Sequence, residues 1–128
     1  MLIKNKINIK LLLILILSFL PPAVYAEEFN ISATEIFIDK DKDTVTGKGN
    51  VEATDSEGKI INADKIVYDK SKEFLLAEGS VKVTDNLGNI IETSKASYDK
   101  KNELIVTGEN SKIFLSDGYN LLTNRILY

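Results

Sequence analysis

A thirty-residue repeat is the sequence feature that most constrains how this chain can fold. One copy, residues 49–68, reads GNVEATDSEGKIINADKIVY, and the next, residues 79–98, reads GSVKVTDNLGNIIETSKASY. The final Tyr128 falls thirty residues after Tyr98, and Ile38 falls thirty before Tyr68. Self-similarity at a period of roughly 20–50 residues is typical of stacked supersecondary units. The repeat therefore predicts a modular fold.

The first 26 residues have the organisation of a secretory signal peptide. Three lysines among the first ten residues precede an apolar run at residues 11–20, which is shorter than the roughly 20 residues that a membrane span needs. Val24 and Ala26 occupy the −3 and −1 positions of a cleavage site before Glu27. We expect cleavage there, and an uncleaved N-terminal anchor is the alternative. No cysteine follows the site, which excludes a lipid-anchored N-terminal cysteine.

Residues 27–128 form the expected mature domain, and its composition excludes several classes of protein. Without the three leader lysines, the 16 Lys and Arg fall to 13 against 19 Asp and Glu, a net charge of −6. A nucleic-acid partner is therefore not expected, because phosphate binding needs clustered cations. An exported chain without cysteine cannot be stabilised by disulfides, and this composition favours the bacterial periplasm.

Alternation of apolar and polar residues predicts strands throughout this domain. Residues 44–53 place Val45, Gly47, Gly49, Val51 and Ala53 on one face, and the next unit repeats this parity. Turns are expected at residues 39–43, 55–58 and 85–88, where Asp begins and Gly ends the latter two. Further strands are expected at residues 29–38, 60–68, 90–98 and 121–128, with a bend near residues 62–64. Such spacing predicts an all-β domain built from two-strand units of about thirty residues.

The third unit departs from the pattern. Gly108 lies 29 residues after Gly79, whereas Ser111 and Asp117 keep the thirty-residue phase. A β-bulge near residues 109–110 would reconcile the two, because a one-residue slip turns the apolar set outward. With this slip, the interior is expected to be lined by Val45, Val51, Ala53, Leu75, Ala77, Val81, Val83, Leu104, Val106, Ile113 and Leu115.

Residues that carry catalytic or metal chemistry are sparse. The chain has no His and no Cys, so it lacks a Ser-His-Asp triad and a thiol nucleophile. Asp39, Asp41 and Asp43 have the spacing that starts an EF-hand loop. However, Thr44 and Asn50 stand where that loop needs Gly and Glu. We therefore expect no enzyme activity, no metal site and no cofactor.

Four short motifs in a fixed order resemble the OstA-type domain. They are F-x-I-S-A-x-x-I from Phe29, G-N-V from Gly49, I-x-A-D-x-I-x-Y-D from Ile61 and E-G-S-V from Glu78. This domain forms the periplasmic lipopolysaccharide-transport protein LptA and the N-terminal part of the outer-membrane translocon LptD. The resemblance implies an open, twisted β-jelly roll whose apolar interior receives acyl chains. In the second and third units, Thr93-Ser94 and Thr123-Asn124 respectively replace the Ala63-Asp64 pair, so nothing specific to the ends of such a bridge is implied.

Several expectations follow from the resemblance. The partners would be lipopolysaccharide, related jelly rolls joined head to tail, and the outer membrane if the chain is the N-terminal piece of a longer LptD-like protein. We expect such an incomplete domain, since the chain stops where earlier units continue. Edge pairing would use Ile31, Ile36, Ile38, Leu122 and Ile126. The alternative is a secreted structural or adhesive β-solenoid with a closed core and no ligand.

Overall fold

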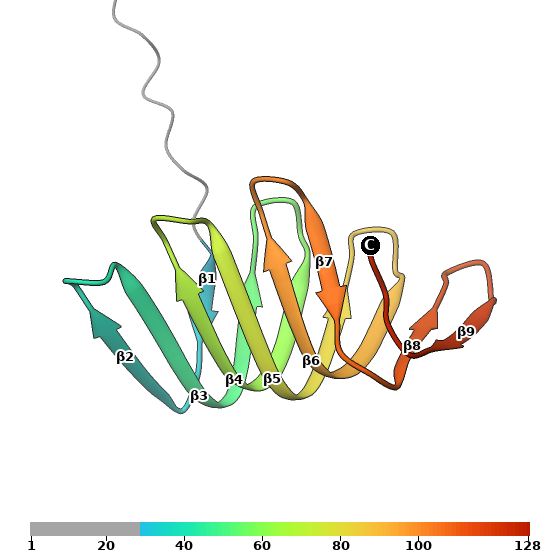
Figure 1. Ribbon diagram of the computed structural model, residues 1–128, viewed down its shortest axis with the longest axis horizontal. Helices are drawn as coiled ribbons and strands as arrows, with labels where there is room; N and C mark the ends of the chain where they lie inside the picture. The colour runs from blue at the N-terminus through green and yellow to red at the C-terminus, as the bar shows by residue number, and fades with distance from the viewer. Residues whose placement is uncertain (1–28) are drawn as a thin grey trace, which may run out of the picture.

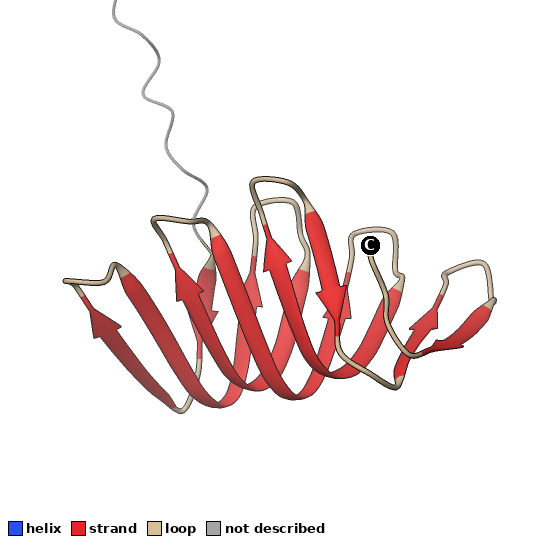
Figure 2. Ribbon diagram, in the orientation of Figure 1, coloured by secondary structure: helices blue, strands red, loops and turns tan. Residues whose placement is uncertain are grey.

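The computed structural model describes residues 29–128, which form one bent antiparallel sheet (Figure 1). Every regular element in this part of the chain is a strand (Figure 2). The predicted signal peptide lies outside the described residues and stays a prediction. The strands are β1 (Asn30–Ser32), β2 (Glu35–Asp39), β3 (Thr44–Thr54), β4 (Ile60–Asp69), β5 (Phe74–Thr84), β6 (Ile90–Asp99), β7 (Leu104–Thr107), β8 (Ser111–Phe114) and β9 (Asn120–Thr123).

Strands β3 to β6 are long and bend at their middles, so the sheet folds into two walls that face each other (Figure 1). We call the wall that runs from β2 to β7 the first wall and the wall that runs from β1 to β9 the second wall. In the first wall, β2 and β7 pair with the halves of β3 and β6 next to the 39–44 and 99–104 connections. In the second wall, β1 and β8 pair with the opposite halves, and β9 follows β8. The all-β fold predicted from the repeat and the open jelly roll implied by the resemblance are both confirmed.

Glycines at equivalent positions create the bends. Gly49 and Gly79 have φ of 76° and 82°, and the residue after each, Asn50 and Ser80, also has positive φ. The register between β3 and β4 shifts between Lys48 and Val51, which is a β-bulge that sharpens local twist. A Cβ on Gly79 would overlap the Asp64 side chain, so the bend needs glycine for both conformation and space. The predicted bend near residues 62–64 is confirmed by a register shift between Asn62 and Lys65.

The third unit keeps the thirty-residue phase without any slip. Asn110 has φ of 57°, as expected for the equivalent of Asn50 and Ser80, so the irregularity near residues 109–110 is the same bend in a third copy. Glu109 stands where Gly49 and Gly79 stand, and the strand is interrupted there, with β7 ending at Thr107 and β8 starting at Ser111. The one-residue slip inferred from Gly108 is wrong, because Gly108 occupies the slot of Glu78 and not that of Gly79.

The connections follow the predicted turn chemistry. Gly58 and Gly88 have positive φ, and each donates its N–H to the carbonyl of the aspartate that begins the turn. The Asp39 side chain accepts hydrogen bonds from the N–H groups of Asp41 and Lys42. The aspartate series at residues 39–43 is therefore turn structure. The segment predicted as one first strand, residues 29–38, is divided into β1 and β2.

The predicted last strand, residues 121–128, is also divided. Its first half is β9, and its second half pairs with β7 beyond a bend at residues 124–125. Ile105 and Tyr128 exchange two backbone hydrogen bonds of 2.7 and 2.9 Å. Residues 120–128 thus follow the path of β4 and β6 and form the outer strand of both walls at the C-terminal end.

Candidate functional site

The candidate site is the space between the two walls, which is lined by apolar side chains. The side chains of Ile61, Ile66, Leu75, Val51 and Tyr68 are at most 1% exposed. They come from both walls and alternate with half-buried or exposed residues along each strand. The complete buried apolar set is Phe29, Val51, Ala53, Ile61, Ala63, Ile66, Tyr68, Leu75, Ala77, Val81, Val83, Ile91, Ala96, Tyr98, Ile105 and Ile126.

Most of the residues predicted to line the interior are found there. The buried ones are Val51, Ala53, Leu75, Ala77, Val81 and Val83. Val45 and Leu115 are half-buried, and Ile113 is partly buried against the core. Their location is thus observed, whereas a role in ligand binding stays a prediction.

Leu104 and Val106 do not line the interior, contrary to the sequence-based expectation. Leu104 is 37% exposed and Val106 is half-buried, whereas their neighbours Ile105 and Thr107 are buried. The physical reason is the unbroken repeat, which aligns Ile105 with Leu75 and Thr107 with Ala77. Side chains alternate between faces along a strand, so the assumed slip assigned β7 to the wrong face.

Sequence reasoning missed two groups of interior residues. Ile61, Ile91 and Ile105 are buried but were not among the predicted interior residues. Ile61 and Ile91 lie thirty residues apart, and Ile105 lies thirty residues after the predicted interior residue Leu75. Tyr68 and Tyr98 were also not assigned to the interior, although they share a face with Ile66 and Ala96, and all four side chains are buried.

The interior becomes polar in the third unit. Ser111 is fully buried where the earlier units have Val51 and Val81. Its hydroxyl lies 2.7 Å from Thr107 Oγ1, 2.7 Å from the Gly108 carbonyl oxygen and 3.0 Å from Thr93 Oγ1. Buried hydroxyls that satisfy one another in this way cost little. Such a network gives the C-terminal third of the interior a different chemistry from the rest.

Side chains also connect the walls across the mouth, the side opposite the bends. Phe29 packs edge-on against Tyr68, with 5.0 Å between the ring centroids. Lys59 Nζ donates to the Tyr98 hydroxyl at 2.9 Å and lies 4.2 Å from the centroid of that ring. The Tyr128 hydroxyl donates to Asp85 Oδ2 at 2.6 Å, and Asn89 Nδ2 lies 3.2 Å from the same hydroxyl.

Electrostatics at the mouth follow from these contacts. Burial alone would lower the pKa of Lys59, but the Tyr98 hydrogen bond and the charges of Asp55 and Glu57 outweigh it and raise that pKa. Burial raises the pKa of Tyr98 despite the nearby ammonium group. Lys59 is therefore fully charged at neutral pH, and Tyr98 is a neutral phenol.

Asp55 leaves one acceptor unsatisfied beside this contact. Its Oδ1 accepts from the N–H groups of Glu57 and Lys59, but Oδ2 is buried without a hydrogen-bond partner. The equivalent atom, Asp85 Oδ2, is bonded to Tyr128. A buried acceptor without a partner costs about 1–3 kcal/mol. The polar groups around Lys59 are therefore less completely hydrogen-bonded than the equivalent groups around Asn89.

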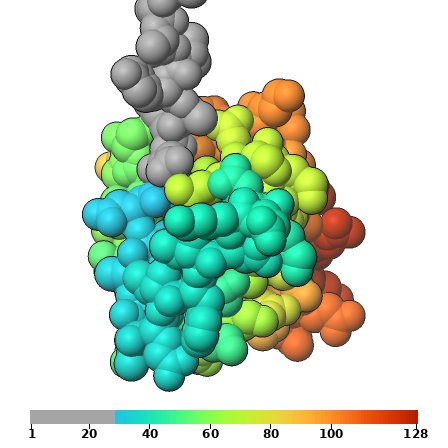
Figure 3. Space-filling view, turned by 90° about the vertical axis from the view of Figure 1, so that its left-hand side faces the viewer, coloured from blue at the N-terminus to red at the C-terminus, as the bar shows by residue number. Residues whose placement is uncertain are grey.

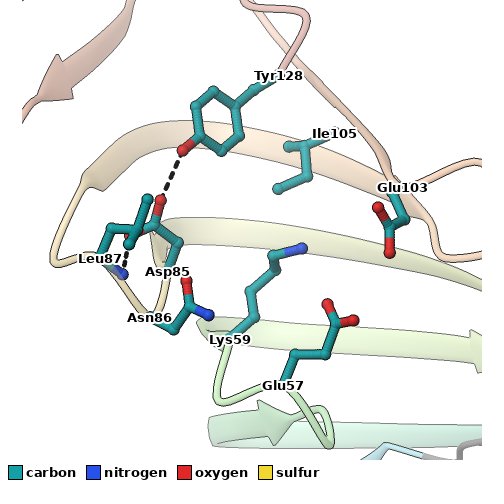
Figure 4. A pocket seen from close by; sticks show the side chains of 8 residues that line it. All are labelled: Glu57, Lys59, Asp85, Asn86, Leu87, Glu103, Ile105 and Tyr128. Atoms are coloured by element: carbon teal, nitrogen blue, oxygen red, sulfur yellow. Dashed lines mark hydrogen bonds between the residues drawn. The ribbon is translucent and has the colours of Figure 1, made fainter.

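A hollow of about 230 Å³ opens at this mouth. Figure 4 shows Lys59 reaching into it, with Glu57 on one side and Tyr128 bonded to Asp85 on the other. Glu103 and Ile105 line it from the first wall, and Asn86 and Leu87 line it from a turn of the second. The described interior below this hollow is filled by side chains, and no channel opens where β1, β2 and β3 cover the N-terminal end (Figure 3).

The two outer strands expose apolar side chains. In β2, Ile36 and Ile38 are 47% and 67% exposed. At the other end, Leu122 of β9 is 79% exposed. Ile31 in β1 is half-buried and packs against the core. These four residues lie on the outer strands β1, β2 and β9, and their part in assembly stays a prediction.

Ile126 does not belong to this set. Its side chain is 5% exposed and sits in the core, and its N–H donates to Thr107 Oγ1 at 2.9 Å. Backbone groups alternate between the two sides of a strand, and those of Ile126 and Tyr128 point inward to β7. The outward backbone groups are therefore those of Leu127. The assignment of Ile126 to edge pairing is therefore wrong, because the outward backbone groups lie one residue later.

Residues 29–128 contain no cluster of three or more side chains suited to hold a metal ion. In the same part of the chain, no helix is long and apolar enough to cross a membrane.

The fold and the site define a class of protein: an open, bent antiparallel jelly roll with an apolar interior between two walls. Among solved structures, the chain is similar to LptH from Pseudomonas aeruginosa, the LptA-homologous periplasmic component of the conserved lipopolysaccharide transport device. The TM-score is 0.71 at 14% identity, over 80% of this chain and 76% of LptH. No protein-family model matches the sequence, and no curated protein matches it. The LptA-type fold implied by the sequence motifs is thereby confirmed.

Proposed function

We propose that this chain is a periplasmic conduit module that binds the acyl chains of lipopolysaccharide between its walls and passes them towards the outer membrane. LptA or the N-terminal domain of LptD would be its functional counterpart. The observation that carries the proposal is the pair of apolar walls, which the backbone joins on one side only, in a fold like that of LptH. The proposal needs no catalytic residue and no cofactor.

The energetics favour a protein carrier for this cargo. An acyl chain of about a dozen carbons costs on the order of 10 kcal/mol in water, at about 0.8 kcal/mol per methylene. Residues such as Val81, Val83 and Leu75 offer it an apolar surface. Their strands belong to walls held together at the mouth by a few side-chain contacts. The apolar length of the first two units would hold the chains, and the hydroxyl network of the third unit would mark the end of that stretch.

A head-to-tail assembly would continue this surface from one molecule to the next. Strand β2 and the segment at Leu127 carry the outward backbone groups of the first wall at opposite ends of the molecule. Pairing between these edges satisfies those groups by strand addition. Because the two surfaces differ, the assembly is open and lengthens with concentration.

The alternative, a secreted structural β-solenoid with a closed core, is favoured by one observation. The interior is filled by its own side chains, without an empty channel among the described residues. The two functions differ in what the purified protein carries. We expect the conduit to copurify with lipid from the periplasm and to bind added lipopolysaccharide with a measurable spectral shift. A protein that does neither is a solenoid.

A further inference from the structure

The walls are connected in two different ways. On one side, β3, β4, β5 and β6 run continuously from wall to wall through their bends. At the mouth, no backbone pairing joins the walls within residues 29–128, and contacts between side chains hold them together. The bends combine positive φ with register shifts, which makes them the natural hinges. Opening therefore requires that the mouth contacts break.

These mouth contacts form a regular row. Phe29 contacts Tyr68, Lys59 contacts Tyr98, and Asn89 contacts Tyr128, each pair 39 residues apart. The repeat thus supplies one contact of this spacing per unit, with a tyrosine always on the first wall. Phe29 adds two further contacts across the mouth, because its ring centroid also lies 5.8 Å from that of Tyr98 and 5.2 Å from Lys100 Nζ. Only the partner on the second wall changes, from an aromatic ring to an ammonium group to an amide.

The middle contact differs from the C-terminal one in how completely its polar groups are hydrogen-bonded. Asp85, Asn89 and Tyr128 form a closed set in which Asp85 Oδ2 receives bonds from both Tyr128 and Asn89. In the middle unit, Lys59 takes the place of Asn89 and binds the Tyr98 hydroxyl, while Asp55 Oδ2 has no hydrogen-bond partner. The Lys59–Tyr98 hydrogen bond therefore lies beside a carboxylate oxygen whose burial is not compensated by a hydrogen bond. We expect this combination in a contact that opens.

From this geometry we infer that the row is a gate, and that the Lys59–Tyr98 contact is the latch that controls entry of an acyl chain from the side into the interior. The inference rests on the proposed function for the identity of the cargo. Breaking the latch exposes the face of Tyr98 and lets the walls part about the bends. Closing it restores the packed interior seen here.

Two substitutions at one position test the latch without any lipid. Lys59→Ala removes the ammonium group and should widen the mouth. Lys59→Asn reproduces the residue at the equivalent position 89 and should keep the mouth closed. The chain has no cysteine, so spin labels can be placed at Asn86→Cys and Lys101→Cys, in turns on opposite rims. We expect the population at the longer distance to rise about fivefold for Lys59→Ala relative to the parent, and not for Lys59→Asn. Identical distance distributions for all three proteins overturn the latch.

A reversible lock tests whether cargo enters through the mouth. The cysteines at positions 86 and 101 are joined by a cleavable bis-maleimide whose spacer matches the closed distance. The control pair is Asn86→Cys with Ser116→Cys, in neighbouring turns of the second wall. We expect binding of purified lipopolysaccharide to fall at least tenfold in the locked protein, to return on cleavage, and to persist in the cross-linked control.

The outcomes separate the gate from the proposed function. Lipopolysaccharide binding by the locked protein at the unlocked rate overturns the gate and leaves the carrier function intact. Absence of binding to every protein, the unlocked parent included, overturns the carrier function, and the label distances then decide the latch alone. Thermal unfolding of each variant confirms that the fold is retained.

Discussion

Neighbouring residues Leu104 and Ile105 provide a direct test of how β7 is oriented. Ile105 is 1% exposed in the interior, whereas Leu104 is 37% exposed on the outer face. Replacing a buried Ile by Ala costs about 2–5 kcal/mol, since it removes contacts and leaves a cavity. Replacing the partly exposed Leu104 by Ala should cost about 1 kcal/mol or less.

Thermal unfolding followed by far-UV circular dichroism measures this difference. For a domain of this size, 1 kcal/mol shifts Tm by about 4–8 °C. We expect Ile105→Ala to lower Tm by at least about 8 °C and Leu104→Ala to lower it by less than that. A larger loss for Leu104→Ala would show that the strand has the opposite parity and that a slip does occur before Gly108. Equal losses would contradict the assigned orientation of β7.

Three further predictions concern export, assembly and pH. Mass spectrometry of periplasmic protein should show Glu27 as the N-terminus, and retention of the leader would contradict this. Ile36→Pro and Leu127→Pro remove outward N–H groups and should stop growth in light scattering over a concentration series. Ile126→Pro should unfold the C-terminal end instead, because that N–H is bonded inward. The hydrogen bonds from Ser71 and Lys72 lower the pKa of Asp69 to about 2. Its folded pKa is depressed, so its contribution holds above its ordinary pKa of 3.8 and disappears as pH falls towards about 2. Tm should therefore fall over this range, less steeply for Asp69→Asn, and equal slopes would exclude a role for Asp69.

The repeat made much of the fold predictable from the sequence. Turn residues at fixed spacing and period-two alternation identify the central strands, because these signals are local. Gly49 and Gly79, which the repeat aligns, lie at the bends, since only glycine adopts their positive φ without strain. Gly108 was misleading because its residue type alone suggested that it was the third glycine of this series. It was aligned with these glycines by residue type, whereas φ at Asn110 shows that the backbone keeps the thirty-residue phase without a glycine at position 109.

The mouth of the site was less predictable. The tyrosines at positions 68, 98 and 128 were visible as a series, but their partners Phe29, Lys59 and Asn89 share a spacing and no chemistry. Alternation specifies which face a residue occupies, and not which residue on the opposite wall it meets. Contacts over 39 residues depend on how far the sheet bends, and that angle is a property of the assembled walls.

The central claim, that the interior holds acyl chains, can be tested at two neighbouring positions. Val81 is 2% exposed between the walls, and Lys82 is exposed on the outer face. A small aliphatic diazirine amino acid at position 81 limits disturbance of the core, and the same group at position 82 serves as the control. After irradiation in cells, we expect lipopolysaccharide to be captured at position 81 and not at position 82. Equal capture at both positions, or capture at position 82 alone, would contradict an interior binding site.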